Sequence, residues 1–516
     1  MTEIVHPNIV PDAVEERRYQ TNLVNSCLGS NTLVILPTGL GKTIVALRVA
    51  AEYVEKGKVL ILAPTKPLLD QHSATFYDLF VGHSVCVVSG TTAPKKRAEM
   101  VQENDVIIST PQTVFNDLAA GRYNLDPFSL IIYDEAHRGV GDYAYVRIAE
   151  FCSRSMRSIG ITASPGHSIE KIKEVCQNLG LRRVEARDEN DRDVAPYVHD
   201  TYVNKVILTL PDDLIMISEL LKQMMERYIK NLIGLRLMNP ARPPTRSHLL
   251  DVQRMLQMRL NSGERTYVVY RGLSLVAMCL KISYAIILAE TQGITPLKAY
   301  LSKLEAEAEE GNKNKAAKQI VGCQEYKDMR RIVDTTNVEH PKVSRTLSIV
   351  SKTLINDPDS KVMVFTQYRE TCDMVVSKLS SVEAARVGKL VGQSNGGLRQ
   401  KEQVELLDKL RSNEINVIVA TSVGEEGLDI SSTNVVVFYE PVPSEIRTIQ
   451  RRGRTGRKND GEVYVLIAAG TLDEAADTVS RKKEADMRHN IEKLNYELSR
   501  GRPIVSDTVQ EDLDGF

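Results

Sequence analysis

The chain has 516 residues, enough for about three domains. Apolar residues make up 42% of it and charged residues 26%, which are globular proportions that exclude long disordered, collagen-like or coiled-coil architectures. The formal net charge is −1, and this total alone gives no indication of a nucleic acid as partner.

The seven cysteines are scattered along the chain, and no two of them form a Cys-x-x-Cys pair. A disulfide framework and a structural zinc site are therefore disfavoured, and we expect a reducing, cytoplasmic location. The longest apolar runs are far below the roughly 20 residues of a membrane span, and the N-terminus lacks the pattern of a secretory signal. We therefore expect no membrane partner.

Short runs of β-branched and apolar residues alternate with helical stretches from residue 30 to about 165. Such runs are typical of strands buried on both faces of a parallel sheet, and their alternation with helices predicts βαβ units. The strands expected here cover residues 32–36, 59–62, 85–88, 106–109, 130–133 and 158–162. A second series begins near residue 340, with strands at 361–365, 417–420, 435–439 and 463–467 and helices at 369–379 and 398–411.

Long amphipathic stretches replace the strand-like runs between the two series. Their apolar residues recur at helical spacing, which predicts a mostly helical insert. The expected helices cover residues 214–238, 248–261, 268–291, 296–310 and 315–333, after a charged connector at 186–200. We therefore predict an α/β fold in which two parallel-sheet domains, 1–203 and 341–495, flank a helical insert at 204–340, with a tail at 496–516.

A glycine-rich turn lies between the first expected strand and the helix after it. It consists of Pro37, Thr38, Gly39, Leu40, Gly41, Lys42 and Thr43, and Leu36 stands where the usual phosphate loop Gly-x-x-x-x-Gly-Lys-Ser/Thr has its first glycine. Gly39 and Gly41 allow backbone N–H groups to close on phosphate, and the helix N-terminus adds its dipole. Lys42 is predicted to reach the β- and γ-phosphates of a nucleotide, and Thr43 to hold Mg²⁺.

An apolar strand ends in an acidic pair, Asp134 and Glu135, 92 residues after Lys42. Asp134 is predicted to hold Mg²⁺ through water, because Mg²⁺ keeps much of its hydration shell. Glu135 is placed to orient and deprotonate an attacking water. His137 follows closely, and we assign it to coupling rather than to chemistry. Together with Lys42, the acidic pair predicts one complete Mg²⁺–nucleotide site.

The segment 450–457 carries four arginines within seven residues. Arg454 and Arg457 lie three residues apart, so both could point at the γ-phosphate. An arginine supplied across a domain interface accelerates phosphoryl transfer by about 10³- to 10⁵-fold. The alternative is a solvated basic loop or a plain phosphate-backbone patch.

Together these motifs resemble those of superfamily 2 helicases, which are built on two RecA-like domains. The resemblance implies that Gln20, beside Arg17, reads adenine. It implies nucleotide contacts for Asp429, at the ribose, and for Gln450. It also implies that Thr162 and Ser164 couple hydrolysis to strand contact. The loops with which the family contacts a nucleic-acid backbone give these candidates: Thr65, Lys66, Thr110, Thr366 and Thr421.

Within that superfamily, the segments 37–43, 62–72, 134–139, 419–430 and 439–457 resemble the archaeal Hef helicases, relatives of FANCM. This resemblance implies ATP-driven remodelling of branched DNA, such as stalled forks and Holliday-type junctions, in association with the nucleoid. Dicer and RIG-I-like enzymes share the helical insert, so a double-stranded RNA translocase is one alternative, and a non-enzymatic scaffold for branched DNA is another. A nuclease motif Glu-Arg-Lys-x-x-x-Asp is absent from the sequence, and we expect no cleavage by this chain.

The near-zero net charge conceals a basic insert. Residues 205–340 hold 20 Lys and Arg against 15 Asp and Glu, which gives +5 and leaves −6 for the remainder. Seven arginines lie between residues 236 and 271, among them Arg254 and Arg259, and only Asp251 and Glu264 oppose them. They are either a solvated helix face or a clamp that grips the duplex phosphates of branched DNA.

The tail ends in Gln510, Leu513 and Phe516, spaced as Gln-x-x-Leu-x-x-Phe. This spacing resembles the box by which replication proteins dock on a sliding clamp, where two apolar side chains fill a pocket. The alternative is a frayed acidic terminus.

Overall fold

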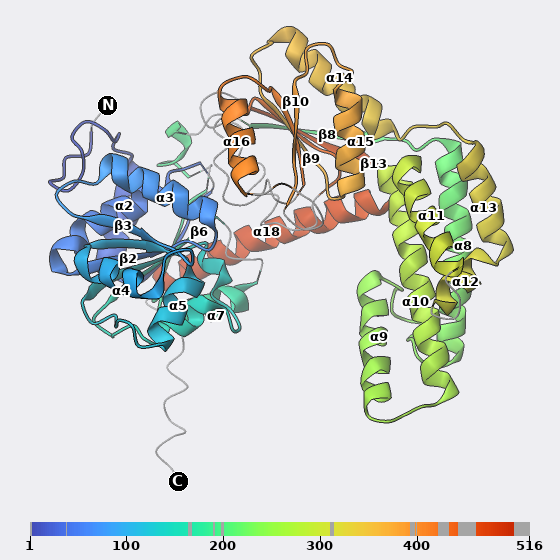
Figure 1. Ribbon diagram of the computed structural model, residues 1–516, viewed down its shortest axis with the longest axis horizontal. Helices are drawn as coiled ribbons and strands as arrows, with labels where there is room; N and C mark the ends of the chain where they lie inside the picture. The colour runs from blue at the N-terminus through green and yellow to red at the C-terminus, as the bar shows by residue number, and fades with distance from the viewer. Residues whose placement is uncertain are drawn as a thin grey trace.

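A computed structural model describes residues 3–37, 39–163, 168–188, 191–197, 201–309, 314–392, 398, 400–421, 433–441 and 461–499. Nine of the predicted functional residues lie outside these ranges: Thr38, Ser164, Asp429, Gln450, Arg454, Arg457, Gln510, Leu513 and Phe516. The described residues form two α/β units and a helical bundle (Figure 1).

The first α/β unit is a parallel sheet in the order β3-β4-β2-β5-β6-β1-β7. Its strands are β1 (Thr32–Ile35), β2 (Lys58–Leu62), β3 (Val85–Val88), β4 (Val106–Ser109), β5 (Phe128–Asp134), β6 (Arg157–Thr162) and β7 (Arg183–Ala186). Its helices are α1 (Arg18–Gly29), α2 (Lys42–Tyr53), α3 (Lys66–Leu79), α4 (Pro94–Glu103), α5 (Pro111–Ala119), α6 (Ala144–Ala149) and α7 (Ile169–Asn178).

Helices cover both faces of this sheet because its strands are apolar on both sides. In β1, Val34 packs into the cluster that contains α1, α2 and α3. Its neighbours Leu33 and Ile35 point the other way, into the cluster that contains α5, α6 and α7. This arrangement confirms the predicted parallel sheet with helices on either side.

The second α/β unit is a parallel sheet in the order β10-β11-β9-β12-β13-β8. Its strands are β8 (Thr201–Leu208), β9 (Val362–Phe365), β10 (Val387–Leu390), β11 (Val417–Ala420), β12 (Val435–Phe438) and β13 (Gly461–Ala468). Its helices are α14 (Pro341–Asn356), α15 (Arg369–Leu379), α16 (Gln400–Arg411) and α18 (Leu472–Ser499).

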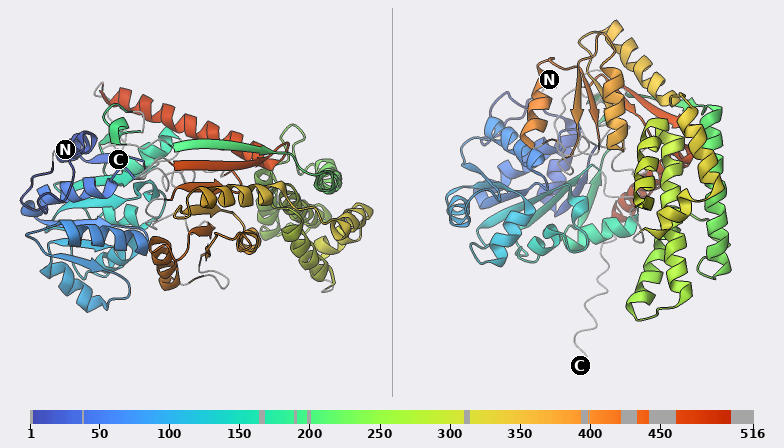
Figure 2. Two further views of the ribbon diagram at one scale, coloured as in Figure 1. Left: turned by 90° about the horizontal axis from the view of Figure 1, so that it is seen from above. Right: turned by 45° about the vertical axis from the view of Figure 1, so that its right-hand side comes forward.

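Two elements of this second unit connect distant parts of the chain. Strand β8 precedes the bundle in sequence, yet it pairs with β13 over its whole length, so the predicted boundary between residues 203 and 204 falls inside a strand of the second sheet. Helix α18 follows β13 and extends back to lie against β7 and α7 of the first unit (Figures 1 and 2). The second sheet is therefore tied to both of its neighbours.

The helical bundle confirms the predicted insert. Its helices are α8 (Asp212–Gly234), α9 (Arg246–Asn261), α10 (Tyr267–Ile287), α11 (Ile294–Glu309), α12 (Lys315–Val321) and α13 (Gln324–Thr335). The single helix expected at 315–333 is wrong, because the chain breaks at Gly322 and Cys323, where Cys323 takes an extended conformation that starts α13. Gly272 of α10 allows α9 to pack closely, since a Cβ there would meet Leu256 at 2.9 Å.

A π-helical turn, η4 (Leu288–Gln292), continues α10. The combined stretch Tyr267–Gln292 is long and apolar enough to cross a membrane by length and composition alone. Most of that stretch is buried against the other bundle helices, which accounts for its apolar composition.

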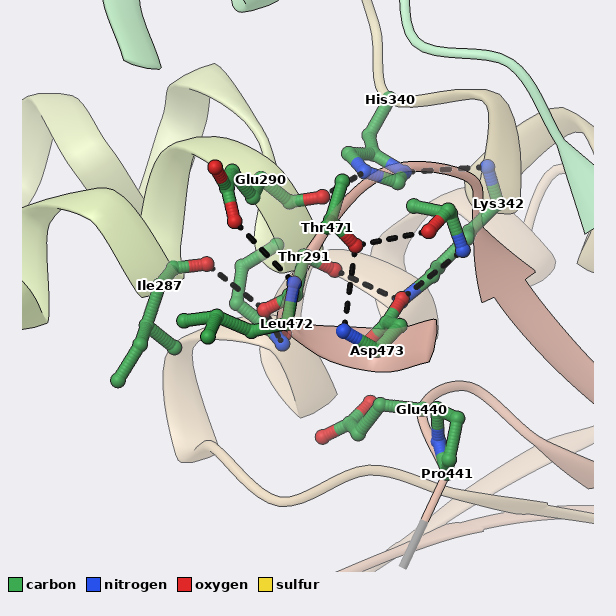
Figure 3. Close-up of polar contacts among 12 residues, drawn as sticks. Ile287, Glu290, Thr291, His340, Lys342, Glu440, Pro441, Thr471, Leu472 and Asp473 are labelled. Atoms are coloured by element: carbon green, nitrogen blue, oxygen red, sulfur yellow. Dashed lines mark hydrogen bonds and ion pairs between the residues drawn. The ribbon is translucent and has the colours of Figure 1, made fainter. Parts of the chain in front are cut away.

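A buried polar junction joins the bundle to the second sheet (Figure 3). The ammonium of Lys342, on the first turn of α14, pairs with the carboxylate of Asp473 on α18 and donates to the carbonyl of Thr291 at 3.1 Å. Beside it, His340 Nε2 donates to the carbonyl of Glu290 at 3.0 Å. Three chain segments thus meet in one network of hydrogen bonds.

Candidate active site

The glycine-rich turn joins β1 to α2 at the carboxyl edge of the first sheet. Gly39 has φ +96° and Gly41 has φ +76°, a left-handed region that favours glycine. Gly41 is the N-cap of α2 and, among the described residues, no side chain caps this helix N-terminus. Lys42 begins α2 and its Nζ lies 3.3 Å from the carbonyl of Leu36. The turn therefore presents a helix N-terminus and one ammonium to the same edge of the sheet.

Gln20 of α1 packs directly on this turn. Its Nε2 donates to the carbonyl of Leu40 at 3.2 Å, and the hydroxyl of Tyr19 donates to the same carbonyl at 2.8 Å. A Cβ added at Gly41 would lie 2.5 Å from Gln20 Nε2, so the side-chain amide of Gln20 occupies space that is open only because residue 41 is glycine. Gln20 is buried, and its Oε1 has no hydrogen-bond partner among the described residues. Arg17 lies next to this group, with its guanidinium 5.4 Å from the ring centre of Tyr197.

Asp134 ends β5, two strands away from β1 in the sheet. Its Oδ1 accepts the N–H of Glu135 at 3.0 Å, and its Oδ2 lies 2.9 Å from His72 Nε2. Burial alone would raise the pKa of Asp134, but the charge and hydrogen bond of His72 and the charge of Lys42 outweigh burial and lower that pKa. The carboxylate is therefore ionised and fixed.

Glu135 takes the left-handed conformation, with φ +48°, which is uncommon for a residue other than glycine. Its Oε2 is buried and lies 3.3 Å from His137 Nδ1. His137 Nδ1 also lies 3.0 Å from the hydroxyl of Thr162, at the end of β6. Two of the residues predicted to act in coupling, His137 and Thr162, are thus in contact, and the carboxylate of Glu135 lies beside His137.

The residues predicted to contact nucleic acid follow neighbouring strands. In the first sheet, Thr65 and Lys66 follow β2 and open α3, while Thr110 follows the adjacent β4 and opens α5. In the second sheet, Thr366 follows β9 and Thr421 follows the adjacent β11. Lys66 is exposed, whereas Thr366 is fully buried and its hydroxyl lies 3.4 Å from the carbonyl of Tyr368.

Arg254 and Arg259 lie on α9 of the bundle and both have acidic partners. Arg254 pairs with Asp251 at 2.6 Å, and Arg259 makes two hydrogen bonds to Glu264, at 2.8 and 2.6 Å. The two acids that oppose the arginine cluster in sequence are therefore the ones that pair with it.

Two residues at the site were missed by sequence reasoning. His72 bonds to Asp134, and the hydroxyl of Tyr145 lies 2.5 Å from the carbonyl of Asp134 and 3.1 Å from that of Leu62. The sequence signal for His72 was its spacing of three residues from Leu69 and four from Phe76, which fits a buried helix face but does not identify its partner.

The described residues fit Mg²⁺ and an adenine nucleotide. Among them no three His, Cys, Asp or Glu gather as a self-sufficient metal site. One ionised carboxylate, Asp134, and one hydroxyl, Thr43, are instead the sparse oxygen ligands that suit Mg²⁺ bound through substrate phosphates and water. The buried, unpaired Oε1 of Gln20 is an acceptor that the amino group of adenine could satisfy.

Comparison with protein families divides the chain into the same three parts. Residues 13–167 match the family described as "Type III restriction enzyme, res subunit". Residues 214–340 match "Putative ATP-dependent RNA helicase, helical bundle", and residues 345–459 match "Helicase conserved C-terminal domain".

Among solved structures, the Pyrococcus furiosus Hef helicase domain matches this chain with 41% identity and a TM-score of 0.72, over 92% of this chain and 100% of that one. This chain belongs to the Hef helicase family. The resemblance predicted from the motifs is thereby confirmed, and so is the fold of two parallel-sheet domains around a helical insert. The enzyme class that goes with this family is the nucleic-acid-dependent ATPase and helicase.

Two curated relatives extend the Hef family comparison. A Methanocaldococcus jannaschii protein named "Putative ATP-dependent RNA helicase MJ1505" is 37% identical over 96% of this chain and 63% of its own length. The Sclerotinia sclerotiorum "ATP-dependent DNA helicase mph1" is 34% identical over 94% of this chain and 41% of its own length. The chain thus spans less than two thirds of the length of the curated relatives that it matches.

Proposed function

We propose that this chain is a DNA-dependent ATPase that translocates on DNA and remodels branched DNA, such as stalled forks and Holliday-type junctions. The observation that carries the proposal is the meeting of Lys42 with the Asp134–Glu135 pair at one edge of the first sheet, where the charge of Lys42 helps to lower the pKa of Asp134. A protein that only binds nucleic acid has no use for this arrangement. The names of several relatives, DNA helicases of fungi, support DNA as the substrate.

In this proposal the first α/β unit holds the nucleotide. Gln20 and Arg17 take the adenine, and the turn from Pro37 to Thr43, with Thr38 in it, takes the phosphates. Thr43 and Asp134 hold Mg²⁺, which would neutralise charge on the transferred phosphoryl group. Glu135 accepts the proton of the attacking water. His137, Thr162 and Ser164 couple hydrolysis of the nucleotide to the contacts with the nucleic-acid strand.

The second α/β unit completes the proposed reaction. Arg454 and Arg457 stabilise the charge that develops on the γ-phosphoryl group, while Asp429 and Gln450 contact the nucleotide. Strand-end groups of both sheets hold a nucleic-acid backbone without reading its sequence. These groups are Thr65, Lys66, Thr110, Thr366 and Thr421, of which Thr366 is fully buried and can take part only after a change of conformation. Closing of the two α/β units around the nucleotide, and their reopening after hydrolysis, then moves the two sets of contacts along one strand.

The test is an ATPase and unwinding panel over forked DNA, four-way junctions, plain duplex DNA and duplex RNA. We expect the largest stimulation by branched DNA, and we expect Lys42→Ala to abolish hydrolysis while Lys96→Ala, an exposed lysine of α4, does not. DNA-stimulated turnover by Lys42→Ala would refute the site. Stimulation by duplex RNA alone would favour the RNA translocase, and binding of forks without turnover would favour the scaffold.

We also propose a docking peptide at the chain's tail, through Gln510, Leu513 and Phe516. A sliding clamp is the partner that its spacing suits, and location at the chromosome accords with that partner. A pull-down with the clamp, with and without residues 505–516, decides: equal retention of both forms would rule the peptide out.

A further inference from the structure

His72 has a buried imidazole that hydrogen-bonds to the carboxylate of Asp134. It lies on the inner face of α3, between Leu69 and Phe76, and is 3% exposed. Its Nε2 is 2.9 Å from Asp134 Oδ2. Because an ionised carboxylate can only accept, the Nε2 nitrogen carries the proton and donates. Its Nδ1 is buried and has no hydrogen-bond partner among the described residues.

The carboxylate of Asp134 is held at both oxygens by this arrangement. Oδ2 accepts from His72, and Oδ1 accepts from the backbone N–H of Glu135 at 3.0 Å. Both bonds involve a charged acceptor in a buried environment, where such bonds are strong and directional. The orientation of the carboxylate therefore depends on where α3 places His72.

Helix α3 carries His72 at one point and the proposed strand-contacting residues at another. The helix opens at Thr65 and Lys66, and His72 lies two turns further along the same rigid element. A second bridge runs parallel to it, because the hydroxyl of Tyr145 is shared between the carbonyls of Leu62, at the end of β2, and Asp134, at the end of β5. A displacement of α3 by a bound strand therefore reaches Asp134 through the imidazole.

We propose that His72 is a positioning residue that couples the strand-contacting end of α3 to the carboxylate of Asp134. The inference rests on the proposed function, since it assumes that Asp134 holds Mg²⁺ and that Thr65 and Lys66 contact a strand. His72 itself touches neither nucleotide nor nucleic acid; it acts through Asp134. Linkage requires the effect to be reciprocal, so Mg²⁺–nucleotide binding must also change the affinity for the strand.

The chain offers a convenient reporter for this coupling, because it contains no Trp. Tyr77 lies on α3 and is 58% exposed, so Tyr77→Trp places the chain's single tryptophan on the helix without disturbing its buried face. The full chain is titrated with Mg²⁺ in the presence of a non-hydrolysable ATP analogue, and separately with a single-stranded DNA oligonucleotide. The emission of the reporter and the affinity for DNA are measured without turnover.

The variants separate the hydrogen bond from packing. His72→Leu and His72→Asn both remove the bond, the first with an apolar side chain and the second with a polar one that is too short. His72→Gln retains an amide N–H at the reach of Nε2. The matched control is His83→Leu, which removes a histidine–carboxylate pair of 3.0 Å, to Glu55, at a more exposed site of the same unit.

We expect His72→Leu and His72→Asn to raise the Mg²⁺ concentration required for the reporter response by about 10- to 100-fold, the usual effect of removing a partner that orients a metal ligand. We also expect them to abolish the effect of the Mg²⁺–analogue on DNA affinity. His72→Gln and His83→Leu should stay within about two-fold of the parent. Thermal unfolding without nucleotide shows which variants are folded. If His72→Leu does not fold, the comparison of His72→Asn with His72→Gln tests the inference.

Two results would overturn the inference. One is retention of the parent's Mg²⁺ requirement and coupling by both bond-removing variants; the other is damage by His72→Gln equal to theirs, which would assign His72 to packing. Failure of the proposed function has a different signature. In that case the parent chain itself lacks DNA-stimulated ATP hydrolysis, whatever stands at residue 72.

Discussion

Lys342 and Asp473 form an ion pair that is almost completely withdrawn from water, with Lys342 0% and Asp473 3% exposed. The pair joins the first turn of α14 to the first turn of α18, and the ring of Tyr439 lies 5.4 Å from the Lys342 ammonium. Burial raises the pKa of Asp473 even though Lys342 opposes the shift. The pair therefore depends on both members being present.

Lys342→Met should strongly destabilise the second α/β unit. Methionine fills a similar volume but leaves the carboxylate of Asp473 buried without its cation, which costs about 3–5 kcal/mol. Differential scanning calorimetry should show a lower midpoint for the corresponding transition. Replacing both partners, by Lys342→Met with Asp473→Leu, should recover much of the loss. The control Lys378→Met breaks the half-exposed pair with Glu339, 2.7 Å long, and should cost at most about 1 kcal/mol.

We expect the free energy of unfolding to fall at mildly acidic pH because His340 is buried in its neutral form. Its Nδ1 accepts the N–H of Lys342 at the start of α14 and its Nε2 donates to Glu290, so the folded chain holds it neutral. Burial, with the nearby charge of Lys342, lowers the pKa of His340 from 6.5 to about 3. The unfolded chain therefore binds the proton that the folded chain excludes, and stability is lost as pH falls from 6.5 towards 3, by about 1.4 kcal/mol per pH unit.

The variant His340→Asn isolates this contribution. The amide oxygen of asparagine can take the helix-capping role of Nδ1 but does not titrate. Urea unfolding at pH 7 and pH 5 should therefore show a smaller loss of stability for His340→Asn than for the parent chain. Equal losses would mean that other groups carry the acid sensitivity.

Gly41→Ala should impair nucleotide binding more than turnover. The substitution forces a side chain into a left-handed conformation, at a cost of about 1–2 kcal/mol, and its Cβ would displace the amide of Gln20. We expect KM for ATP to rise about 10-fold, the effect of one lost hydrogen bond, and the preference for ATP over GTP to fall, as in Gln20→Ala. Gly29→Ala is the control, since no atom lies within 4 Å of a Cβ placed there. An unchanged KM would exclude Gln20 from the nucleotide site.

Glu135→Gln should separate nucleotide binding from hydrolysis. Glutamine preserves the shape of the side chain but cannot accept the proton of the attacking water. We expect kcat of the DNA-stimulated ATPase to fall by about 10²- to 10⁴-fold. Affinity for a fluorescent ATP analogue should remain within about two-fold. The control Glu103→Gln changes an exposed glutamate of α4. Substantial turnover by Glu135→Gln would assign the base role elsewhere.

Strand-end chemistry was predictable because it is local in the sequence. Gly39, Gly41 and Lys42 follow a strand directly, and Asp134 with Glu135 ends another, so a parallel sheet must bring them to one edge. Pairing between distant segments was not predictable in this way. Nothing near His72 indicates that it meets Asp134, because the fold of the whole unit brings α3 over the end of β5.

The strands that the sequence did not predict lie at sheet edges, where they need not be apolar on both faces. Edge strand β8 carries the exposed residues Val203, Asn204 and Lys205, so it lacks the continuous apolar run of a strand buried on both faces. Edge strand β7 is short and charged at Arg183 and Glu185, and edge strand β10 is short and contains Gly388 and Lys389. The break in the expected helix at 315–333 was missed because its apolar spacing continues across Gly322.

The arginines of α9 and the acids beside them offer a test of whether the bundle binds DNA. Asp251 lies between Arg242, at 3.2 Å, and Arg254, at 2.6 Å, while Glu264 takes both hydrogen bonds of Arg259. Phosphate groups that bind these arginines must compete with the two acids. If α9 contacts duplex phosphates, removing the acids should strengthen binding, whereas a solvated face predicts no change.

Two opposite double variants test this. Arg254→Glu with Arg259→Glu should weaken binding of forked DNA and reduce the slope of log K against log salt concentration by about 2, since each phosphate contact contributes about 0.9. Asp251→Asn with Glu264→Gln should tighten binding and steepen that slope. The control Arg331→Glu reverses an arginine of α13 that is about as exposed as Arg254 and pairs with Asp328 at 3.3 Å. A slope that is the same for the parent and both double variants would show that these arginines only face solvent.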